Sequence, residues 1–206
     1  MQTVTFAGGS ALQKAEGVVR TYPTIWCGRV LDVGCRSREL EKALANANIQ
    51  YTGLDIAPGA DIVADLGDRI PLGDGAVDVV SALDVLEHTN DIHRAFSEIC
   101  RVARRHIIIT LPNAYEVGVR LRILRGRPVS GKYGLPIARP RDRHRWFFSL
   151  SEASEFIGEN AAANGWRLAD ERAVVGPNRA RLKSAVERWP NVLSGTYLAL
   201  LSAPQH

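Results

Sequence analysis

The stretch Val30–Leu40, VLDVGCRSREL, indicates the fold class. Its first four residues are apolar except for Asp32, as in a buried parallel strand, and Gly34 then begins a tight turn. The following segment Glu39–Asn48, ELEKALANAN, repeats apolar side chains at helical spacing. A strand, a glycine turn and a helix in this order predict the first unit of a parallel α/β sheet.

The same alternation of strand and helix continues along the chain. We predict strands at Arg29–Val33, Gln50–Ile56, Asp61–Ala64, Val77–Leu83, His106–Leu111, Trp166–Val175 and Thr196–Ser202. We predict helices at Ser10–Arg20, Glu39–Asn48, Asp91–Ala103, Ser151–Asn164 (capped by Ser151) and Arg179–Arg188. This pattern predicts an α/β fold with a doubly wound, Rossmann-like sheet, mostly parallel and covered by helices on both faces.

A chain of 206 residues favours one domain. We assign residues 1–206 to it, with an N-terminal helical segment at about 8–26 and a basic lid or insertion at about 113–146, where the alternation gives way to Gly, Pro and Arg. The N-terminus lacks the basic start and apolar run of a signal peptide, and no apolar run approaches the roughly 20 residues of a membrane span. The sequence therefore predicts a cytoplasmic protein.

The cysteines carry no sign of a disulfide framework or a metal site. There are three, Cys27, Cys35 and Cys100, and they are widely spaced without a C-x-x-C pair. An odd number at this spacing is typical of buried thiols. No metal site is predicted from the sequence.

Positive charge is concentrated in one segment. Eleven basic and two acidic residues lie between Arg104 and Arg145, a local balance of +9, while the rest of the chain has 15 basic and 20 acidic residues. We expect this segment to face something anionic. Its part Arg120–Arg127 suits peripheral contact with an anionic membrane or a phosphorylated substrate. A solvated lid whose arginines pair with the acidic remainder is the alternative.

Aspartates lie at the carboxyl ends of four predicted strands, where an open α/β sheet binds its ligand. They are Asp32, Asp55, Asp65 and Asp84. A carboxylate at the position of Asp55 can accept hydrogen bonds from both hydroxyls of a ribose. Aspartates also end loops and cap helices, which is the alternative for each one alone. Neither G-x-G-x-x-G nor a phosphate-binding loop is present, so a nucleoside ligand without a pyrophosphate fits best.

These features together resemble the class I S-adenosylmethionine (SAM) dependent methyltransferases. The matching stretches span about residues 29–168 and read VLDVGC, YTGLDI, ADLGDRIPLGDGAVDVVSALDVLEHTND, IIITLPN and HRWFFSLSEASEFIGENAAANGW. The resemblance implies SAM as cofactor, and a seven-stranded sheet whose last strand, Thr196–Ser202, is inserted antiparallel.

The resemblance also implies a set of cofactor-binding residues. Asp32 and Gly34 would hold the amino acid end of SAM, Asp55 the ribose hydroxyls, and Asp65 with Leu66 the adenine. The end of the fourth strand would border the sulfonium. The full set is Asp32, Gly34, Cys35, Arg36, Asp55, Ile56, Asp65, Leu66, Ala82 and Asp84.

The sequence departs from the family at the opening turn, where Arg36 and Arg38 occupy positions that carry glycine in the family. Three interpretations remain open. The turn relaxes to ordinary φ and an arginine pairs with the SAM carboxylate; both side chains point to solvent; or they fill the pocket and leave a silent descendant. If these positions need positive φ, each arginine costs roughly 1 kcal/mol or more.

The acceptor is less well indicated than the cofactor. His144, His88 and Asp142 are candidates for a general base, which a hydroxyl acceptor requires. Packing of His144 beside Trp146 and helix capping by His88 are the alternatives. We expect transfer to oxygen or nitrogen of a small-molecule or glycan-like, lipid-linked acceptor that carries negative charge. A catalytically silent binding protein and an RNA-directed enzyme are the competing hypotheses, and nucleic acid is disfavoured because the basic segment has few aromatic residues for base stacking.

Overall fold

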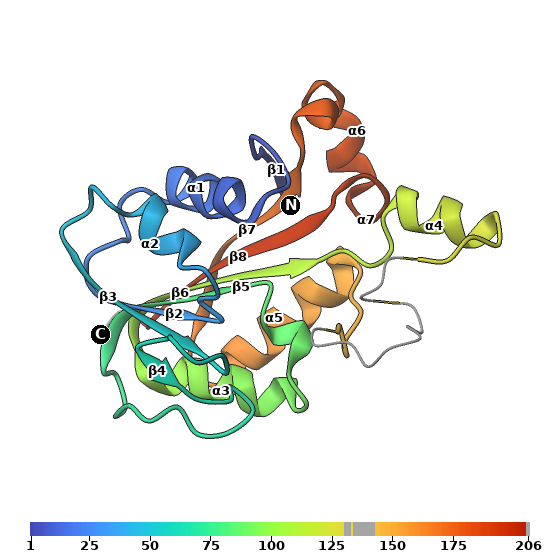
Figure 1. Ribbon diagram of the computed structural model, residues 1–206. Helices are drawn as coiled ribbons and strands as arrows, with labels where there is room; N and C mark the ends of the chain where they lie inside the picture. The colour runs from blue at the N-terminus through green and yellow to red at the C-terminus, as the bar shows by residue number, and fades with distance from the viewer. Residues whose placement is uncertain (130–132, 134–142, 205–206) are drawn as a thin grey trace.

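One mixed sheet forms the centre of the molecule (Figure 1). The structure, a computed structural model, describes residues 1–129, 133 and 143–204. Within them the strand order is β1-β7-β8-β6-β5-β2-β3-β4. The strands are β1 (Gln2–Thr5), β2 (Gly28–Val33), β3 (Ile49–Asp55), β4 (Ile62–Val63), β5 (Val77–Leu83), β6 (Ala103–Pro112), β7 (Arg167–Val175) and β8 (Thr196–Ser202). Only β8 runs antiparallel to its neighbours, β6 and β7, as the resemblance implies.

Helices cover both faces of this sheet. In the described part of the chain they are α1 (Ala11–Thr21), α2 (Glu39–Ala43), α3 (Ile92–Val102), α4 (Val117–Leu124), α5 (Leu150–Ala163), α6 (Lys183–Arg188) and α7 (Pro190–Leu193), with the 3-10 helices η1 (Leu86–His88) and η2 (Pro177–Leu182). Figure 1 shows α1 and α2 on one face and α3 and α5 on the other. The predicted α/β fold is confirmed.

The alternation of side chains along the strands builds two cores. Val30 and Ile108 pack with α1 and α2, whereas the adjacent Leu31 and Ile107 pack with α3 and α5. All four side chains are fully buried. Because successive side chains on a strand point to opposite faces, a strand buried on both faces must be apolar throughout. This explains why three of the four residues of VLDV are apolar, with Asp32 as the exception.

The helix predicted at Glu39–Asn48 is too long, because α2 ends at Ala43. After Leu44 the backbone N–H groups of Ala45 and Ala47 donate to carbonyls three residues back, which makes a series of turns. The asparagines that alternate with alanine here compete for backbone hydrogen bonds and do not favour a helix interior. Leu44 is nevertheless buried, which is why the helical spacing was visible in the sequence.

Two other local predictions need correction. The cap of α5 is Ser149 and not Ser151: the Ser149 hydroxyl accepts from the Glu152 N–H, and the Glu152 carboxylate accepts from the Ser149 N–H at 2.8 Å. This reciprocal pair is a capping box. The helix predicted at Arg179–Arg188 begins as the 3-10 helix η2 and becomes α-helical only in α6.

The sheet has one strand more than the seven that the resemblance implies. The additional strand β1 pairs parallel with β7 at the edge of the sheet, with Gln2 opposite Arg172. Its four residues, QTVT, are too few to show a clear alternation. Edge strands are often this short.

The basic insertion contains α4, which projects from the body of the molecule (Figure 1). None of its residues is buried, and Leu124 is 82% exposed. Arg179 anchors its start through an ion pair with Glu116 at 2.8 Å. Lys132, Arg139, Arg141 and the candidate base Asp142 lie outside the described residues. Within the described ranges, no helix combines the length and the apolar character needed to cross a bilayer.

Candidate active site

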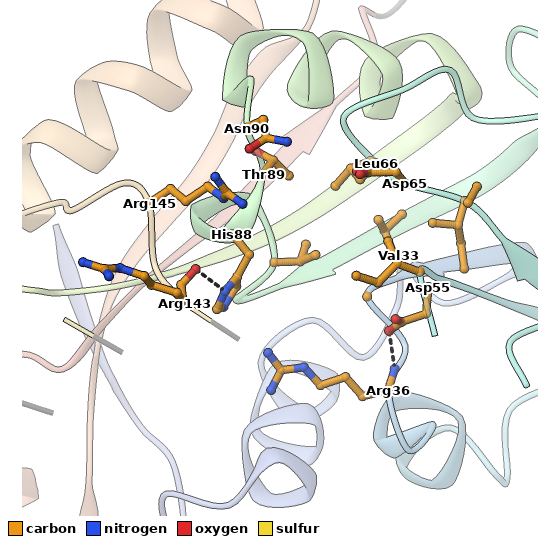
Figure 2. A pocket seen from close by; sticks show the side chains of 15 residues that line it. Val33, Arg36, Asp55, Asp65, Leu66, His88, Thr89, Asn90, Arg143 and Arg145 are labelled. Atoms are coloured by element: carbon orange, nitrogen blue, oxygen red, sulfur yellow. Dashed lines mark hydrogen bonds between the residues drawn. The ribbon is translucent and has the colours of Figure 1, made fainter. Parts of the chain in front are cut away.

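A cavity of about 520 Å³ opens at the carboxyl ends of β2, β3 and β5. This volume lies within the range of about 300–1,000 Å³ that is typical of small-molecule sites. Figure 2 shows its labelled side chains in two groups that face each other across the opening. We call the group around Asp55 and Asp65 the carboxylate wall, and the group formed by His88, Arg143 and Arg145 the basic wall.

Most of the cofactor residues predicted from the sequence lie on the carboxylate wall. The members that line the cavity are Gly34, Arg36, Asp55, Ile56, Asp65 and Leu66. The remaining predicted members, Asp32, Cys35, Ala82 and Asp84, are not among the described lining residues. The strand ends therefore bring six of the predicted residues to the cavity surface. The other four do not line it.

The turn after β2 brings Gly34 and Arg36 to the cavity. The Gly34 and Cys35 N–H groups both donate to the Leu54 carbonyl, at 2.7 and 3.1 Å, which fixes the end of β2 against the end of β3. Gly34 has φ +73°, and a Cβ there would lie 2.7 Å from a methyl of Val85. Only glycine meets both requirements, because other residues avoid this backbone region and this contact.

Asp55 is held rigidly at the end of β3. One carboxylate oxygen accepts from the Arg36 N–H at 3.0 Å and the other accepts from the Ala57 N–H at 2.9 Å. Each oxygen has a second lone pair for a further donor. The carboxylate is therefore preorganised to accept two hydrogen bonds from one ligand.

Asp32 lies behind the carboxylate wall and is 5% exposed. Its carboxyl accepts from the Tyr51 hydroxyl at 2.8 Å. Burial raises the pKa of Asp32 to about 7, because a charged carboxylate is poorly solvated there. Asp32 is thus a buried titratable group next to the site.

Arg36 and Arg38 both keep the left-handed backbone that glycine prefers, with φ of 46° and 60°. The interpretation in which the turn relaxes to ordinary φ is wrong for both. Arg38 turns away from the cavity: its guanidinium pairs with Glu41 at 2.6 Å and Asp61 at 3.0 Å, and it lies over the Tyr51 ring. Arg36, in contrast, lines the cavity.

Asp84 pairs with a lysine of α1 that the sequence did not link to it. The Lys14 ammonium of α1 forms an ion pair with its carboxylate, and the Thr110 hydroxyl donates to it at 2.7 Å. Burial alone would raise the pKa of Asp84, but Lys14, Thr110 and the nearby Arg36 bring it below its ordinary value. Two cations, Lys14 and Arg36, therefore meet at the end of β5. Nothing in the sequence links Lys14 to a residue 70 positions away.

The basic wall joins η1 to the end of the basic insertion. The Arg145 and Trp146 N–H groups donate to the Glu87 carbonyl at 2.8 and 3.2 Å. The His88 ring nitrogen Nδ1 lies 3.0 Å from the Arg143 carbonyl. His88 lines the cavity, and His144 packs against it with ring centroids 4.6 Å apart. The structure thus brings together two of the three candidate bases.

Sequence reasoning did not identify several lining residues. They are Val33, Leu54, Ala64, Val85, Thr89, Asn90, Arg143 and Arg145. Thr89 and Asn90 follow directly on LEH, so their proximity to His88 was a usable signal. Arg143 and Arg145 were counted only in the charge of the basic segment, because nothing local indicates which arginines of an insertion return to the site.

The sheet order, the antiparallel β8 between β6 and β7, and a carboxylate at the end of β3 beside the cavity define a class I SAM-dependent methyltransferase fold. Comparison with known proteins supports the same class. A family model described as a methyltransferase domain matches residues 31–109. The ubiquinone biosynthesis O-methyltransferase of Azorhizobium caulinodans is 30% identical over 178 residues, covering 77% of this chain and 67% of that protein.

Solved structures share the fold at lower identity. A SAM-dependent methyltransferase from Archaeoglobus fulgidus is 17% identical with a TM-score of 0.63, covering 94% of this chain and 95% of that one. The magnesium protoporphyrin IX methyltransferase of Synechocystis, solved with bound S-adenosylhomocysteine (SAH), is 18% identical with a TM-score of 0.57, covering 96% and 90%. The chain belongs to the class I SAM-dependent methyltransferase family. It is a methyltransferase that uses SAM, and the hypothesis of a silent protein is not supported.

Proposed function

We propose that the enzyme transfers the methyl group of SAM to a hydroxyl oxygen of an anionic small-molecule or glycan-like acceptor. The observation that carries this proposal is the division of one cavity into a carboxylate wall and a basic wall. The two walls differ in charge and therefore suit different ligands. Similarity to an enzyme named as an O-methyltransferase supports oxygen over nitrogen as the atom that is methylated.

The carboxylate wall fits the nucleoside part of SAM. Asp55 offers two preorganised acceptors for ribose hydroxyls, and Asp65 and Leu66 offer a polar and an apolar contact for adenine. The cations at the end of β5, Lys14 and Arg36, suit the methionyl carboxylate because charge-assisted pairs are the strongest hydrogen bonds. Bound SAM supplies an electrophilic methyl group on a sulfonium.

The basic wall suits the acceptor. Arg143 and Arg145 line it and attract a negatively charged group. Alignment of the acceptor oxygen with the methyl carbon and the sulfur provides much of the rate enhancement in such a displacement. A hydroxyl must also lose its proton, and the cluster of Glu87, His88 and His144 is the group beside the cavity suited to promote that loss.

The helix α4 supports delivery of the acceptor from an anionic membrane surface. Ile123 and Leu124 are 62% and 82% exposed, and Arg120, Arg122 and Arg125 lie within or next to the same helix. Apolar side chains among arginines favour a bilayer that carries negative charge. We expect sedimentation with anionic vesicles, and an Ile123→Asp, Leu124→Asp variant to remain in solution. Equal sedimentation of variant and wild type would exclude α4 as the contact.

Methyl transfer to a matched panel of acceptors tests the proposal. The panel pairs hydroxylated aromatic acids with their uncharged esters and with amine analogues, and labelled methyl from SAM is counted in each product. We expect transfer to the hydroxyl of the anionic members. An Arg143→Gln, Arg145→Gln variant should lose this preference for charge, whereas Arg94→Gln, on the exposed side of α3, should keep it. Transfer to amines alone, or equal rates with acids and esters, would contradict the proposal.

A further inference from the structure

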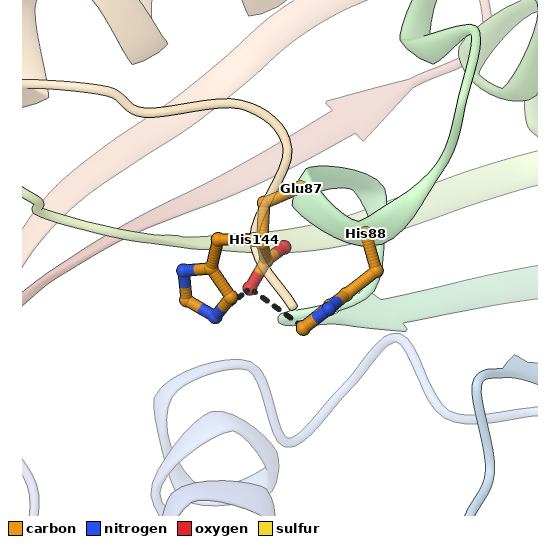
Figure 3. Close-up of side chains that lie close together, drawn as sticks. All are labelled: Glu87, His88 and His144. Atoms are coloured by element: carbon orange, nitrogen blue, oxygen red, sulfur yellow. Dashed lines mark ion pairs between the residues drawn. The ribbon is translucent and has the colours of Figure 1, made fainter. Parts of the chain in front are cut away.

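Three side chains with metal-binding atoms converge beside the basic wall. A carboxylate oxygen of Glu87 and one ring nitrogen each of His88 and His144 all lie within 4.8 Å of one another. Figure 3 shows the two imidazoles on either side of the carboxylate. Glu87 is fully buried and His144 is 5% exposed. In the part of the chain that the structure describes, these are the three side chains that could together hold a metal ion.

The backbone holds the three side chains in this arrangement. Glu87 and His88 belong to η1, whereas His144 lies at the end of the basic insertion, 56 positions after His88. The Arg145 and Trp146 N–H groups donate to the Glu87 carbonyl, and the Trp146 indole N–H donates to the Thr89 carbonyl at 2.9 Å. Hydrogen bonds on both sides thus fix the segment that carries His144 against η1.

The hydrogen bond of His88 orients its ring for metal binding. A carbonyl can only accept, so the contact of Nδ1 with the Arg143 carbonyl at 3.0 Å places the proton of the neutral imidazole on Nδ1. The lone pair is then on Nε2, which lies 3.7 Å from the Glu87 carboxylate. Histidines that bind metals commonly donate their other ring N–H to a carbonyl in this way.

The distances are close to those of a coordination shell. The Nε2 atoms of His88 and His144 lie 3.7 and 3.8 Å from Glu87 Oε1. Ligand atoms about 2.0–2.1 Å from a tetrahedral Zn²⁺ are about 3.4 Å apart. The three ligand atoms lie within 4.8 Å of one another, so the side chains would move closer together on binding one ion. A hydrogen bond between imidazole and carboxylate would require a closer approach, about 2.7–2.9 Å.

We propose that Glu87, His88 and His144 bind a Zn²⁺-type divalent ion at the acceptor side of the cavity. Two imidazoles and one carboxylate form a donor set found in catalytic zinc sites, where three protein ligands leave a position for water or substrate. The sequence pointed to no metal, because that expectation rested on the cysteines alone.

The ion would activate the acceptor, a role that rests on the proposed function. His88 lines the cavity, so an ion held by this cluster would lie beside the space for the acceptor. A metal-bound hydroxyl loses its proton more readily, because the ion stabilises the resulting anion. The acceptor O–H proton passes to solvent, the new O–C bond forms, the C–S bond of SAM breaks with its electrons on sulfur, and SAH remains. The ion changes no oxidation state.

Metal titration of the whole protein tests the site without any activity assay. Chelator-treated protein is titrated with ZnSO₄ by calorimetry, and with CoCl₂ by visible absorption, which reports the ligand field. We expect one equivalent of Zn²⁺ to bind and to displace Co²⁺. The matched variants are His88→Gln and Glu87→Gln, with His93→Gln, a histidine on the exposed side of α3, as control.

His88→Gln and Glu87→Gln should each weaken Zn²⁺ binding by roughly 10- to 100-fold or more, since loss of even an indirect partner has this effect. His93→Gln should bind as wild type does. Absence of Zn²⁺ and Co²⁺ binding to the wild-type protein would overturn the proposal, whether or not the variants fold. Zn²⁺ affinity that is unchanged in folded His88→Gln and Glu87→Gln would also overturn it. Titration of the chelator-treated protein with SAH separates this failure from a failure of the proposed function.

Discussion

The two walls of the cavity are built in different ways. The carboxylate wall comes from the ends of adjacent strands, β2 to β4, where hydrogen bonds between the β2 turn and the end of β3 position Gly34 and Asp55. The basic wall joins η1 to Arg143–Arg145, where the end of the long insertion returns to the sheet. The strand ends are fixed by the fold, whereas a surface insertion can change in length and composition without altering the sheet. We infer that the carboxylate wall serves the common cofactor and the basic wall serves the particular acceptor.

The largest expected effect is on the stability of the fold, and it comes from Asp32, which lies behind the carboxylate wall. The pKa of Asp32 is raised from 3.8 to about 7, so the folded protein takes up a proton between these values and its stability falls as pH rises through that window. Asp32→Asn removes this pH dependence, which amounts to at most about 4 kcal/mol over the whole window. Urea unfolding at about pH 5 and pH 8 measures the larger part of it, the part that lies above pH 5. An identical change of stability between the two pH values in variant and wild type would contradict the burial argument.

The next effect tests the carboxylate wall itself. Asp55→Ala removes two acceptors for the ribose, and hydrogen bonds to a charged group contribute about 1.5–3 kcal/mol each, so SAH should bind at least about 100-fold more weakly by calorimetry. Asp68→Ala is the matched control, because Asp68 is an exposed carboxylate just beyond Asp65. His88→Gln, on the basic wall, should leave SAH affinity unchanged. A larger loss of SAH affinity in His88→Gln than in Asp55→Ala would reverse the assignment of the walls.

The basic wall gives a smaller effect on the acceptor. An Arg143→Gln, Arg145→Gln variant keeps the Arg143 carbonyl that holds His88 and removes two positive charges from the cavity. We expect KM for an anionic acceptor to rise about tenfold, as for the loss of one charge-assisted hydrogen bond, with SAH affinity unchanged. Steady-state kinetics with the acid and its ester measure the difference. A similar rise in KM for both acceptors would indicate a packing defect and not a loss of charge recognition.

The two arginines of the turn give the smallest effects. Arg38→Gly relieves backbone strain of roughly 1–2 kcal/mol but loses ion pairs worth about 0.2–1 kcal/mol each, so stability should change by less than about 1 kcal/mol and SAH affinity should not change. Arg36→Gly relieves similar strain and removes a cation from the cavity, so SAH should bind about fivefold more weakly. A greater loss of SAH affinity in Arg38→Gly than in Arg36→Gly would show that the two roles have been exchanged.

The difference between the walls also explains what the sequence could predict. Strands such as Val77–Leu83 and Thr196–Ser202 were predicted to the residue, because buried β-branched and aliphatic runs between turns have few alternatives. The aspartates at strand ends were likewise predictable, because topology alone brings those ends to one edge. Their roles toward the ligand remain predictions.

The parts of the site that the sequence did not predict depend on contacts between residues far apart in the chain. Lys14 meets Asp84, and His144 meets Glu87, only because α1 and the end of the insertion fold back onto the sheet. No local pattern encodes such contacts. At the turn after β2, the sequence shows that arginines occupy the positions that carry glycine in the family. Only the structure shows that the Arg38 side chain turns away into ion pairs, whereas the Arg36 side chain lines the cavity.

The most direct test of the division into two walls is a crystal structure of the protein with SAH. Our account predicts both ribose hydroxyls within hydrogen-bond distance of the Asp55 carboxylate and adenine beside Asp65 and Leu66. It predicts the homocysteine carboxylate near Arg36, with the space next to His88 and Arg143 left for the acceptor. A structure with the ribose or the adenine on the basic wall would contradict the account.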